Sequence, residues 1–136
     1  MKLEFKQIAC YLPYELKIMQ YRDDLKLSFE SNLISLSNDT LGVTSTRFPF
    51  NEKIQYHEAK PILRPLLDFE KAICKDLMIK FSTSLIIIHE IWSLIQKEKT
   101  LNQINYETYL FMCKNHVDFN NLIENNLAID INTINQ

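Results

Sequence analysis

The sequence predicts an α+β fold, with an N-terminal antiparallel β-meander packed against a C-terminal group of helices. In the first half, apolar and polar residues alternate in short runs that polar turns separate, which is typical of paired strands. In the second half, apolar residues recur at helical spacing. Between the halves lies Lys60-Pro61-Ile62-Leu63-Arg64-Pro65-Leu66, where each proline disfavours helical geometry in the residue before it. This segment therefore predicts an extended joint.

Domain organisation follows from the length and from these patterns. A chain of 136 residues fits a single domain and can bury a core without disulfides or metals. We expect residues 1–59 to be mainly β, residues 60–66 to form the extended joint and residues 67–136 to be mainly α.

The first half should hold one short helix and several strands. Leu3 to Leu12 predicts the helix, because its apolar residues share one face, and Pro13 is expected to end it. The turns are expected at Asp23-Asp24, Ser31-Asn32 and Asn38-Asp39, with a loop at Phe48-Pro49-Phe50. The strands are expected at residues 16–21, 25–30, 33–37, 41–46 and 53–58.

Helical spacing begins after Pro65. The first helix is expected on the stripe formed by Leu66, Phe69, Ile73, Leu77 and Phe81. Ser82-Thr83-Ser84 can cap a second helix, from Leu85 to Lys97, which is apolar nearly all round and is therefore expected to lie centrally. Its Ile86-Ile87-Ile88 run fits a buried strand equally well, so residues 83–90 stay open between helix and strand.

The last third predicts two capped helices and a closing strand. Asn105 is the expected N-cap of a helix that carries Tyr109 and Cys113 on its apolar stripe. Asp118 is the expected N-cap of the next helix, with Val117 and Leu122 as its hydrophobic staple. The chain should leave that helix in left-handed geometry at Asn125-Asn126 and continue into a short closing strand over residues 127–132.

The composition argues against several classes of protein. A net charge of -2 gives no general attraction to nucleic acid or to anionic membranes. The single glycine, Gly42, is too few for phosphate loops and dinucleotide fingerprints, where the backbone must approach phosphate closely. Cys10, Cys74 and Cys113 are dispersed, which fits a reducing cytosol better than a disulfide framework. Without a signal segment or a membrane-length apolar run, we expect a cytoplasmic protein.

Metal and catalytic motifs are incomplete. Cys113-x-x-His116 supplies two ligands where tetrahedral zinc needs four, and Cys113 lies on an apolar stripe. His89-Glu90 matches half of a zinc-protease signature, but position 93 is serine where the second histidine is needed. We therefore expect His89 to be partly buried and Glu90 to be a surface charge. We also expect no metal, no cofactor and no enzymatic activity.

The best candidate binding surface is basic and follows the joint. The predicted partner contacts are Lys60, Arg64, Lys71 and Lys75. Residues that can add phosphate contacts or base stacking are Arg47, Phe50, Lys53 and Tyr56. Acidic residues are interspersed among these cations, so an ordinary solvated face is the alternative interpretation.

Three segments carry a family resemblance: YLPYELK at residues 11–17, KPILRPL at 60–66 and NLIENNLAIDIN at 121–132. Together they resemble a family of small proteins from Bacteroidota phages and prophages. The likeness covers the two ends of the chain and the joint, whereas residues 67–99 depart from the family pattern. The resemblance brings no catalytic or binding residue with it.

What the resemblance implies is an accessory protein that binds and redirects host machinery in the cytoplasm. Some such proteins in flavobacterial hosts inhibit CRISPR effectors, so this chain resembles an anti-CRISPR protein. Its expected partner is a host protein or ribonucleoprotein, such as a CRISPR effector with its guide RNA, and no membrane. We favour stoichiometric binding. The alternatives are a phage regulatory protein that binds RNA or DNA directly, and a small hydrolase or nuclease; the oligomeric state stays open.

Overall fold

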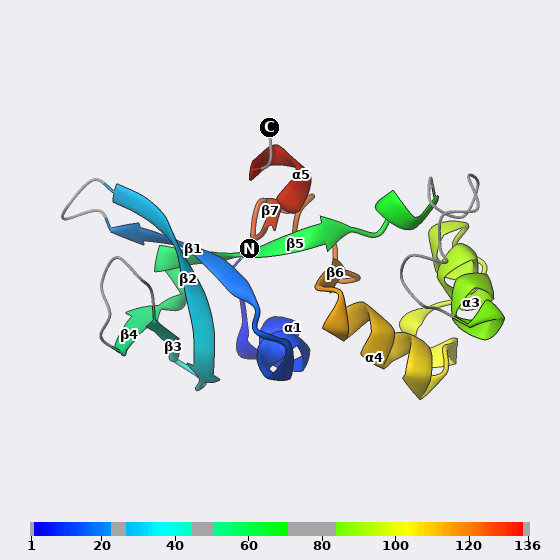
Figure 1. The fold of residues 1–136 in the computed structure, drawn as a ribbon, viewed down its shortest axis with the longest axis horizontal. Coiled ribbons are helices and arrows are strands. Elements are labelled where there is room, and N and C mark those ends of the chain that lie inside the picture. Colours follow the sequence, from blue (N-terminus) through cyan, green and yellow to red (C-terminus); the bar gives the residue numbers. More distant parts are fainter. Residues whose placement is uncertain (1, 23–26, 45–50, 71–83, 135–136) are drawn as a thin grey trace.

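The computed structural model describes residues 2–22, 27–44, 51–70 and 84–134, and it confirms the α+β fold class. The first half is an antiparallel meander in which each strand pairs with the next one along the chain (Figure 1). Its strands are β1 (Lys17–Arg22), β2 (Leu27–Leu36), β3 (Thr40–Thr44) and β4 (Glu52–Gln55). The meander that the alternation predicts is therefore present.

The predicted extended joint is a strand within the sheet, β5 (Ala59–Pro65). The chain leaves β4 through a short 3₁₀ helix, η2 (Tyr56–Glu58), and returns to the far side of β1, where Pro61 lies opposite Ile18. The resulting strand order is β4-β3-β2-β1-β5, followed by β6 (Val117–Asp118) on the other side of β5. From there β5 crosses from the meander toward the helices (Figure 1). The segment is extended as expected. It is not an isolated joint, however, because backbone pairing with neighbouring strands keeps it extended.

Two short strands from the C-terminal third pair with β5 in parallel. In β6 (Val117–Asp118), Val117 lies opposite Arg64; in β7 (Ile129–Asp130), Ile129 lies opposite Ile62. The strand β7 falls within the predicted closing strand, whereas β6 was not predicted. Parallel partners need a long crossover, and here the helices between β5 and β6 provide it.

The turn that we expected at Ser31-Asn32 is wrong, because β2 runs straight through it to Leu36. Ser31 is buried, and its hydroxyl donates a hydrogen bond to Oε1 of Gln20 on β1 at 2.9 Å. The polar side chain is thus used for a bond across the sheet and not for reversing the chain. The next expected turn does form, since the backbone N–H of Ser37 donates to the carbonyl of Thr40 at 3.0 Å.

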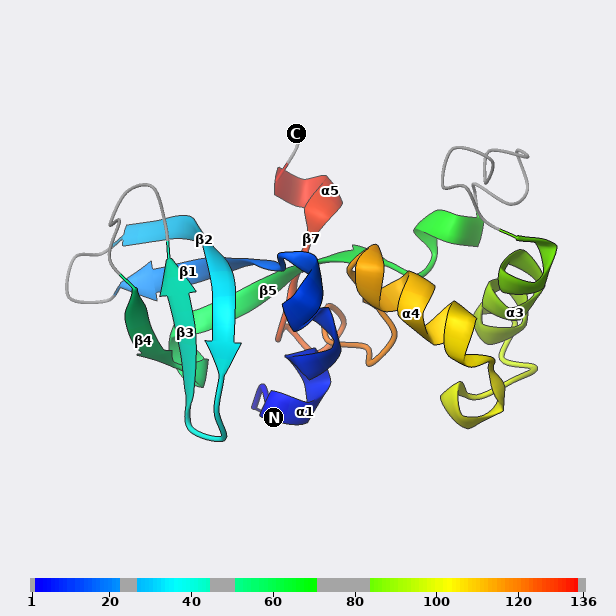
Figure 2. The ribbon, with the colours of Figure 1, turned by 60° about the horizontal axis from the view of Figure 1, so that its bottom comes forward.

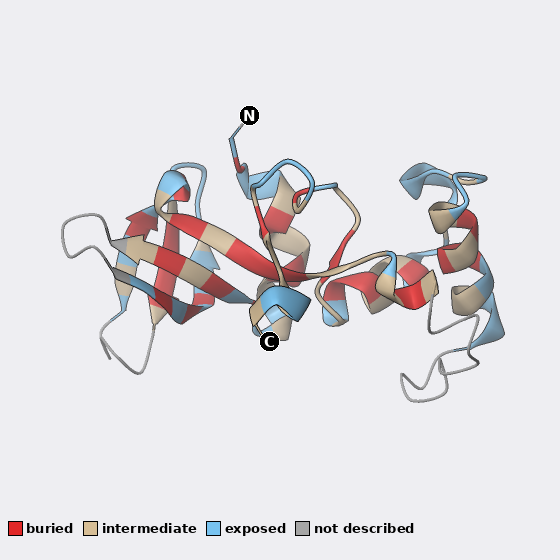
Figure 3. Ribbon diagram, turned by 90° about the horizontal axis from the view of Figure 1, so that it is seen from above, coloured by how far each residue is buried: buried red, intermediate tan, exposed pale blue. Residues whose placement is uncertain are grey.

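The N-terminal helical segment lies between the sheet and the C-terminal helices (Figures 1 and 2). It consists of α1 (Phe5–Ile8) followed by the 3₁₀ helix η1 (Ala9–Tyr14). Pro13 does not end the helix, because its fixed φ suits the last 3₁₀ turn; the chain leaves at Glu15, whose φ is 55°. The buried face of this segment packs into the main core with Leu16, Ile18 and Leu63 (Figure 3).

The alternative between helix and strand is decided for residues 85–90, which belong to the helix α3 (Leu85–Ile95). Ser84 caps it, accepting a hydrogen bond from the N–H of Ile87 at 3.4 Å. The expectation that this helix lies centrally is wrong: α3 sits at the end of the molecule away from the sheet (Figure 1), with Leu85 83% exposed. Its inner face joins a second, smaller cluster with Phe69, Met112 and Val117.

The predicted helix over residues 66–81 is described through residue 70 and is helical at 68–70; the remainder lies outside the described residues. The helix after Asn105 is present as α4 (Tyr106–Lys114). Asp118 does cap the following segment, but residues 122–126 form turns and not the predicted helix. Asn126 has the expected left-handed φ, 59°, and a short helix, α5 (Ile131–Ile134), replaces the end of the closing strand.

No helix among the described residues is long and apolar enough to cross a membrane. Packing joins the two halves, since Phe119 contacts both hydrophobic clusters. The single-domain organisation stays a prediction.

Candidate partner-binding groove

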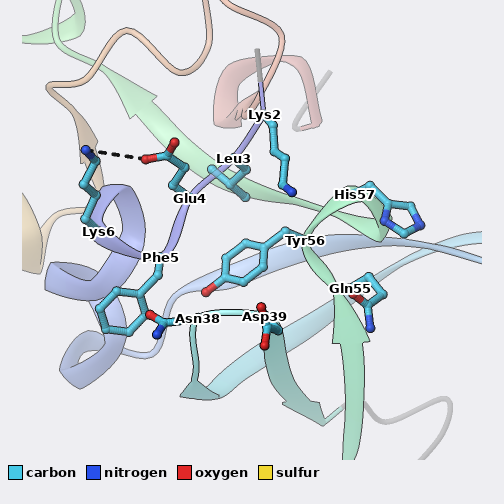
Figure 4. A pocket seen from close by; sticks show the side chains of 10 residues that line it. All are labelled: Lys2, Leu3, Glu4, Phe5, Lys6, Asn38, Asp39, Gln55, Tyr56 and His57. Carbon is cyan, nitrogen blue, oxygen red and sulfur yellow. Dashed lines mark ion pairs between the residues drawn. The ribbon is translucent and has the colours of Figure 1, made fainter.

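A hollow of about 670 Å³ opens beside the N-terminal segment (Figure 4). Three parts of the chain enclose it: the segment leading into α1, the turn between β2 and β3, and the junction of β4 with η2. The described residues that line it are Lys2, Leu3, Glu4, Phe5, Lys6, Asn38, Asp39, Gln55, Tyr56 and His57. Eight of these ten are exposed, so the rim is accessible to a partner that lies across the surface.

The floor of this hollow is rigid and apolar. Leu3 and Tyr56 are its two buried residues, each 5% exposed. The Tyr56 hydroxyl donates a hydrogen bond to the carbonyl of Ser37 at 2.6 Å, which ties η2 to the turn after β2. Burial raises the pKa of Tyr56, and the nearby charge of Asp39 raises it further. The hydroxyl therefore stays a donor at neutral pH and keeps the ring in place.

A second hollow, of about 280 Å³, continues from the first. It shares four lining residues with the first hollow and adds Ala59, Lys60 and Leu127. We refer to the two hollows together as the N-terminal groove. Among the described residues that line this second part, the ionisable ones are Lys2, His57, Lys60 and the buried Tyr56, with no carboxylate. Cationic groups thus stand around an apolar floor at this end of the groove.

The charge at the other end is mixed. Glu4 and Asp39 line the first hollow, and Glu4 pairs with Lys6 at 3.5 Å between Oε2 and Nζ (Figure 4). Both side chains of this pair are largely exposed, so it contributes little to stability. The groove therefore runs from a mixed end near α1 to a basic end near β5.

Lys60, a predicted contact, lies at the basic end. Its ammonium donates to Oδ1 of Asn126 at 3.1 Å and lies 5.9 Å from the ring centroid of Tyr21. These contacts orient the Lys60 side chain and leave it half-exposed.

Arg64 lies on the same face of β5 as Lys60, four residues further on, but it is not among the described residues that line the groove. Its guanidinium lies 3.5 Å from Asp68, and the Asp68 carboxylate accepts two hydrogen bonds from the side-chain amide of Asn132, at 3.0 and 3.1 Å. Arg64 thus helps to hold the C-terminal segment. The other two predicted contacts, Lys71 and Lys75, lie outside the described residues.

The other candidate contacts are placed as follows. Tyr56 lies in the groove, but it is buried and serves as floor, not as a stacking platform. Lys53 is exposed on the edge strand β4. Arg47 and Phe50 lie outside the described residues.

Sequence reasoning missed Lys2, Lys6 and His57. No signal in the sequence could have grouped them, because the groove exists only where the chain start crosses η2. The closest hint was the alternation of Lys2, Glu4 and Lys6 before the first helix, which also reads as an ordinary solvated face.

The expectations for His89 and Glu90 are reversed in the structure. His89 is exposed, whereas Glu90 is 3% exposed and lies between α3 and α4. Helical geometry explains this, because Glu90 shares the inner face with Ile91, while His89 points outward. The buried carboxylate accepts hydrogen bonds from the start of α4.

Metal-ligating side chains do not gather in the described part of the chain, where no group of three or more His, Cys, Asp or Glu residues could hold an ion. Cys113 and His116 of the Cys-x-x-His motif have separate structural roles. Cys113 is buried in the main core, and His116 Nε2 is 2.6 Å from the carbonyl of Tyr14.

Comparison with known proteins gave no match: no family model, no curated protein and no solved structure matches this chain.

Proposed function

We propose that this protein acts by stoichiometric binding, without catalysis, and that the N-terminal groove is its partner-binding surface. The observation that carries the proposal is the groove itself: an accessible rim that runs from a mixed end to a basic end, over a buried apolar floor. Rigid floors of this kind reduce the cost of ordering on binding.

The chemistry of the groove favours a protein segment with acidic and apolar side chains. At the basic end, Lys2 and Lys60 can meet carboxylates while Leu3 and Ala59 take up an apolar side chain. The length of the groove, over two adjoining hollows, suits an extended segment better than a compact metabolite.

The family resemblance directs this proposal to a host target. We place the protein in the cytoplasm of a bacterial host, where it would act as a phage-encoded inhibitor of a defence ribonucleoprotein, namely a CRISPR effector with its guide RNA. Occupation of an acidic, apolar site on the effector would then block its activity.

Direct binding of RNA or DNA is the alternative, favoured by the lysines at the basic end of the groove. Against it stand the carboxylates of Glu4 and Asp39 in the adjoining hollow and the net charge of -2, which repel phosphate. We therefore treat nucleic-acid binding as an outcome of the test.

The test uses the full chain, a purified host CRISPR effector with its guide RNA, and biolayer interferometry. Charge reversal of Lys2 and Lys60 (K2E/K60E) should weaken binding roughly tenfold or more. The matched control is K17E/K114E, which changes the net charge equally at exposed positions outside the groove lining. The control should bind like the unaltered chain and should still restore plaque formation on an immune host.

Three results would overturn the proposal. One is that K2E/K60E binds no more weakly than its control, which includes the case in which the unaltered chain does not bind the effector. Another is tight binding to a single-stranded RNA or DNA probe with a steep salt dependence that K2E/K60E abolishes, which would establish the alternative. The third is turnover of a substrate at catalytic concentration that a chelator abolishes, which would make the protein a hydrolase or nuclease.

A further inference from the structure

Two cysteines from opposite ends of the chain meet in the main core. Cys10 lies in η1 and Cys113 in α4, and both pack in the main hydrophobic cluster, close enough for each thiol to shift the pKa of the other. Cys113 is 1% exposed, whereas Cys10 is half-buried at the edge of the same cluster. Nothing in the N-terminal groove uses either thiol, so the pair is a separate feature of the fold.

The segments that carry the two thiols are held together on both sides of them. The Tyr11 hydroxyl donates to the carbonyl of Val117, and the ring of His116 lies within hydrogen-bond distance of the Tyr14 carbonyl. These contacts flank Cys10 and Cys113 along both chains. The fold therefore holds the segments that carry the two cysteines side by side.

The surroundings of the pair favour a shared negative charge. Interaction with the Cys10 thiol, and to a smaller extent with the Tyr109 hydroxyl, lowers the pKa of Cys113 despite burial. The same interaction with Cys113 and burial raise the pKa of Cys10. The first proton is thus lost from the pair, and the second is retained. A thiolate beside a thiol is the reactive form in thiol oxidation.

We propose that Cys10 and Cys113 form a reversible intramolecular disulfide when the protein meets a two-electron oxidant of the peroxide class. Peroxide reaches the pair from the side of Cys10, the more exposed thiol. As the Cys10 sulfur attacks the peroxide, its proton passes to the Cys113 thiolate. One oxygen atom is transferred to Cys10, the O–O bond breaks, and the leaving hydroxide takes up that proton and departs as water. The Cys113 sulfur then attacks Cys10, the S–O bond breaks and a second water leaves. Two thiols and one peroxide become one disulfide and two waters.

The disulfide would join the segment that precedes β1 to α4. Residues 2–6, which wall the N-terminal groove, lie only a few positions before Cys10. Oxidation would therefore limit opening between that segment and α4, while reduction would release it. The inference stands on the thiol pair and does not depend on the proposed function.

The test is a peptide map of the native, full chain after treatment with hydrogen peroxide and blocking of the remaining thiols. Trypsin places the three cysteines in separate peptides, residues 7–17, 72–75 and 100–114. We expect peptide 7–17 linked to peptide 100–114, at a mass about 2 Da below the sum of the two, and lost on reduction with dithiothreitol. The same treatment in concentrated urea should spread the links to Cys74.

Variants separate a specific pair from general thiol reactivity. In Cys113→Ser, Cys10 lacks its partner, so we expect a Cys10 sulfenic acid that dimedone traps, and no link between Cys10 and Cys74. Cys74→Ser should leave the link between Cys10 and Cys113 intact. Recovery of Cys10 and Cys113 as unlinked thiols or sulfinic acids from the native unaltered chain would overturn the proposal, as would predominant links to Cys74. The peptide map of the unaltered chain does not depend on whether any variant folds.

Discussion

The carboxylate of Glu90 on α3 accepts a hydrogen bond from the hydroxyl of Thr108 on α4, at 2.5 Å. The same carboxylate accepts the backbone N–H of Asn105, at 3.0 and 3.1 Å, and lies 3.6 Å from the ammonium of Lys99. Asn105 occupies the N-cap position of α4, yet in the described structure its own side chain makes no capping hydrogen bond. Glu90 thus caps α4 from the neighbouring helix and supplies negative charge at its N-terminus.

Glu90→Gln should lower the free energy of unfolding near neutral pH by about 1–3 kcal/mol, because a buried charged acceptor is replaced by an amide. Urea unfolding monitored by circular dichroism measures this loss. Glu107→Gln, at an exposed position in the first turn of α4, is the control and should change stability by less than about 0.5 kcal/mol. Equal effects of the two substitutions would contradict the capping role.

The contribution of Glu90 should depend on pH. Burial alone would raise its pKa, but the hydrogen bonds from Thr108 and Asn105 and the charge of Lys99 outweigh burial, so the pKa is lowered. A carboxyl with a lowered folded-state pKa adds stability above its unfolded value, about 4.3, and loses it as pH falls through the folded one. The stability gap between the unaltered chain and Glu90→Gln should therefore narrow in acid. A gap that stays constant down to acid unfolding would contradict this.

Asp118→Asn should destabilise the segment between β6 and β7. The buried Asp118 carboxylate accepts backbone N–H groups from Asn120, Leu122 and Ile123, at 3.2, 3.0 and 2.8 Å. An asparagine amide cannot accept at both of its ends, so we expect a loss of about 1–3 kcal/mol and faster amide exchange at Leu122 and Ile123.

The control for that substitution is Asp130→Asn, where the carboxylate accepts one N–H, from Asn132 at 2.8 Å, at a half-exposed position. It should cost clearly less. Unchanged exchange at Leu122 and Ile123 in Asp118→Asn would show that the carboxylate does not hold this segment.

Gly42→Ala should destabilise the meander through a steric contact across the β2–β3 pair. Gly42 lies opposite Ser35 next to a register shift, and a Cβ on Gly42 would come 1.9 Å from Oγ and 3.2 Å from Cβ of Ser35. Rotation of the serine relieves part of this, so the expected cost is about 1–2 kcal/mol. A Ser35→Gly background should reduce the cost of Gly42→Ala. Additive effects in this double-mutant cycle would disprove the contact.

Lys60→Met and Arg64→Met should differ, although both residues lie on one face of β5. Lys60 lines the groove, so its substitution should weaken binding to the partner and leave stability within about 0.5 kcal/mol. Arg64 contacts Asp68 outside the groove lining, so its substitution should leave partner affinity unchanged. Interferometry and urea unfolding on the same samples separate the two effects. A larger loss of partner affinity in Arg64→Met than in Lys60→Met would show that the partner binds outside the groove.

Local sequence patterns predicted the elements whose partners lie nearby in the chain. Strand alternation located the meander, Ser84 and Asn105 marked the starts of α3 and α4, and Asn126 has the left-handed geometry expected of it. The failures have a common cause. Ser31 suits a turn in isolation, but bonding to Gln20 across the sheet keeps it within β2.

The same distinction applies to the candidate sites. Lys60 could be selected from the sequence because it lies in the proline-bounded segment, and it does line the groove. Lys2 and His57 could not, since they meet only when the chain start crosses η2. Glu90 was misplaced because the period of an apolar helix does not show which face will meet a neighbour.

By itself, the sequence determined the α+β class, the antiparallel meander, the extended course of residues 60–65 and the starts of α3 and α4. These depend on backbone preferences and side-chain periodicity, which act over a few residues. Only the tertiary structure decided that β5 returns beside β1, that β6 and β7 join it in parallel, and that Glu90 caps α4. It also decided that Cys10 and Cys113 pack in one hydrophobic cluster and that Lys2, His57 and Lys60 share a groove. Those contacts join residues far apart in the chain, and burial and pairing energies, not local propensity, select them.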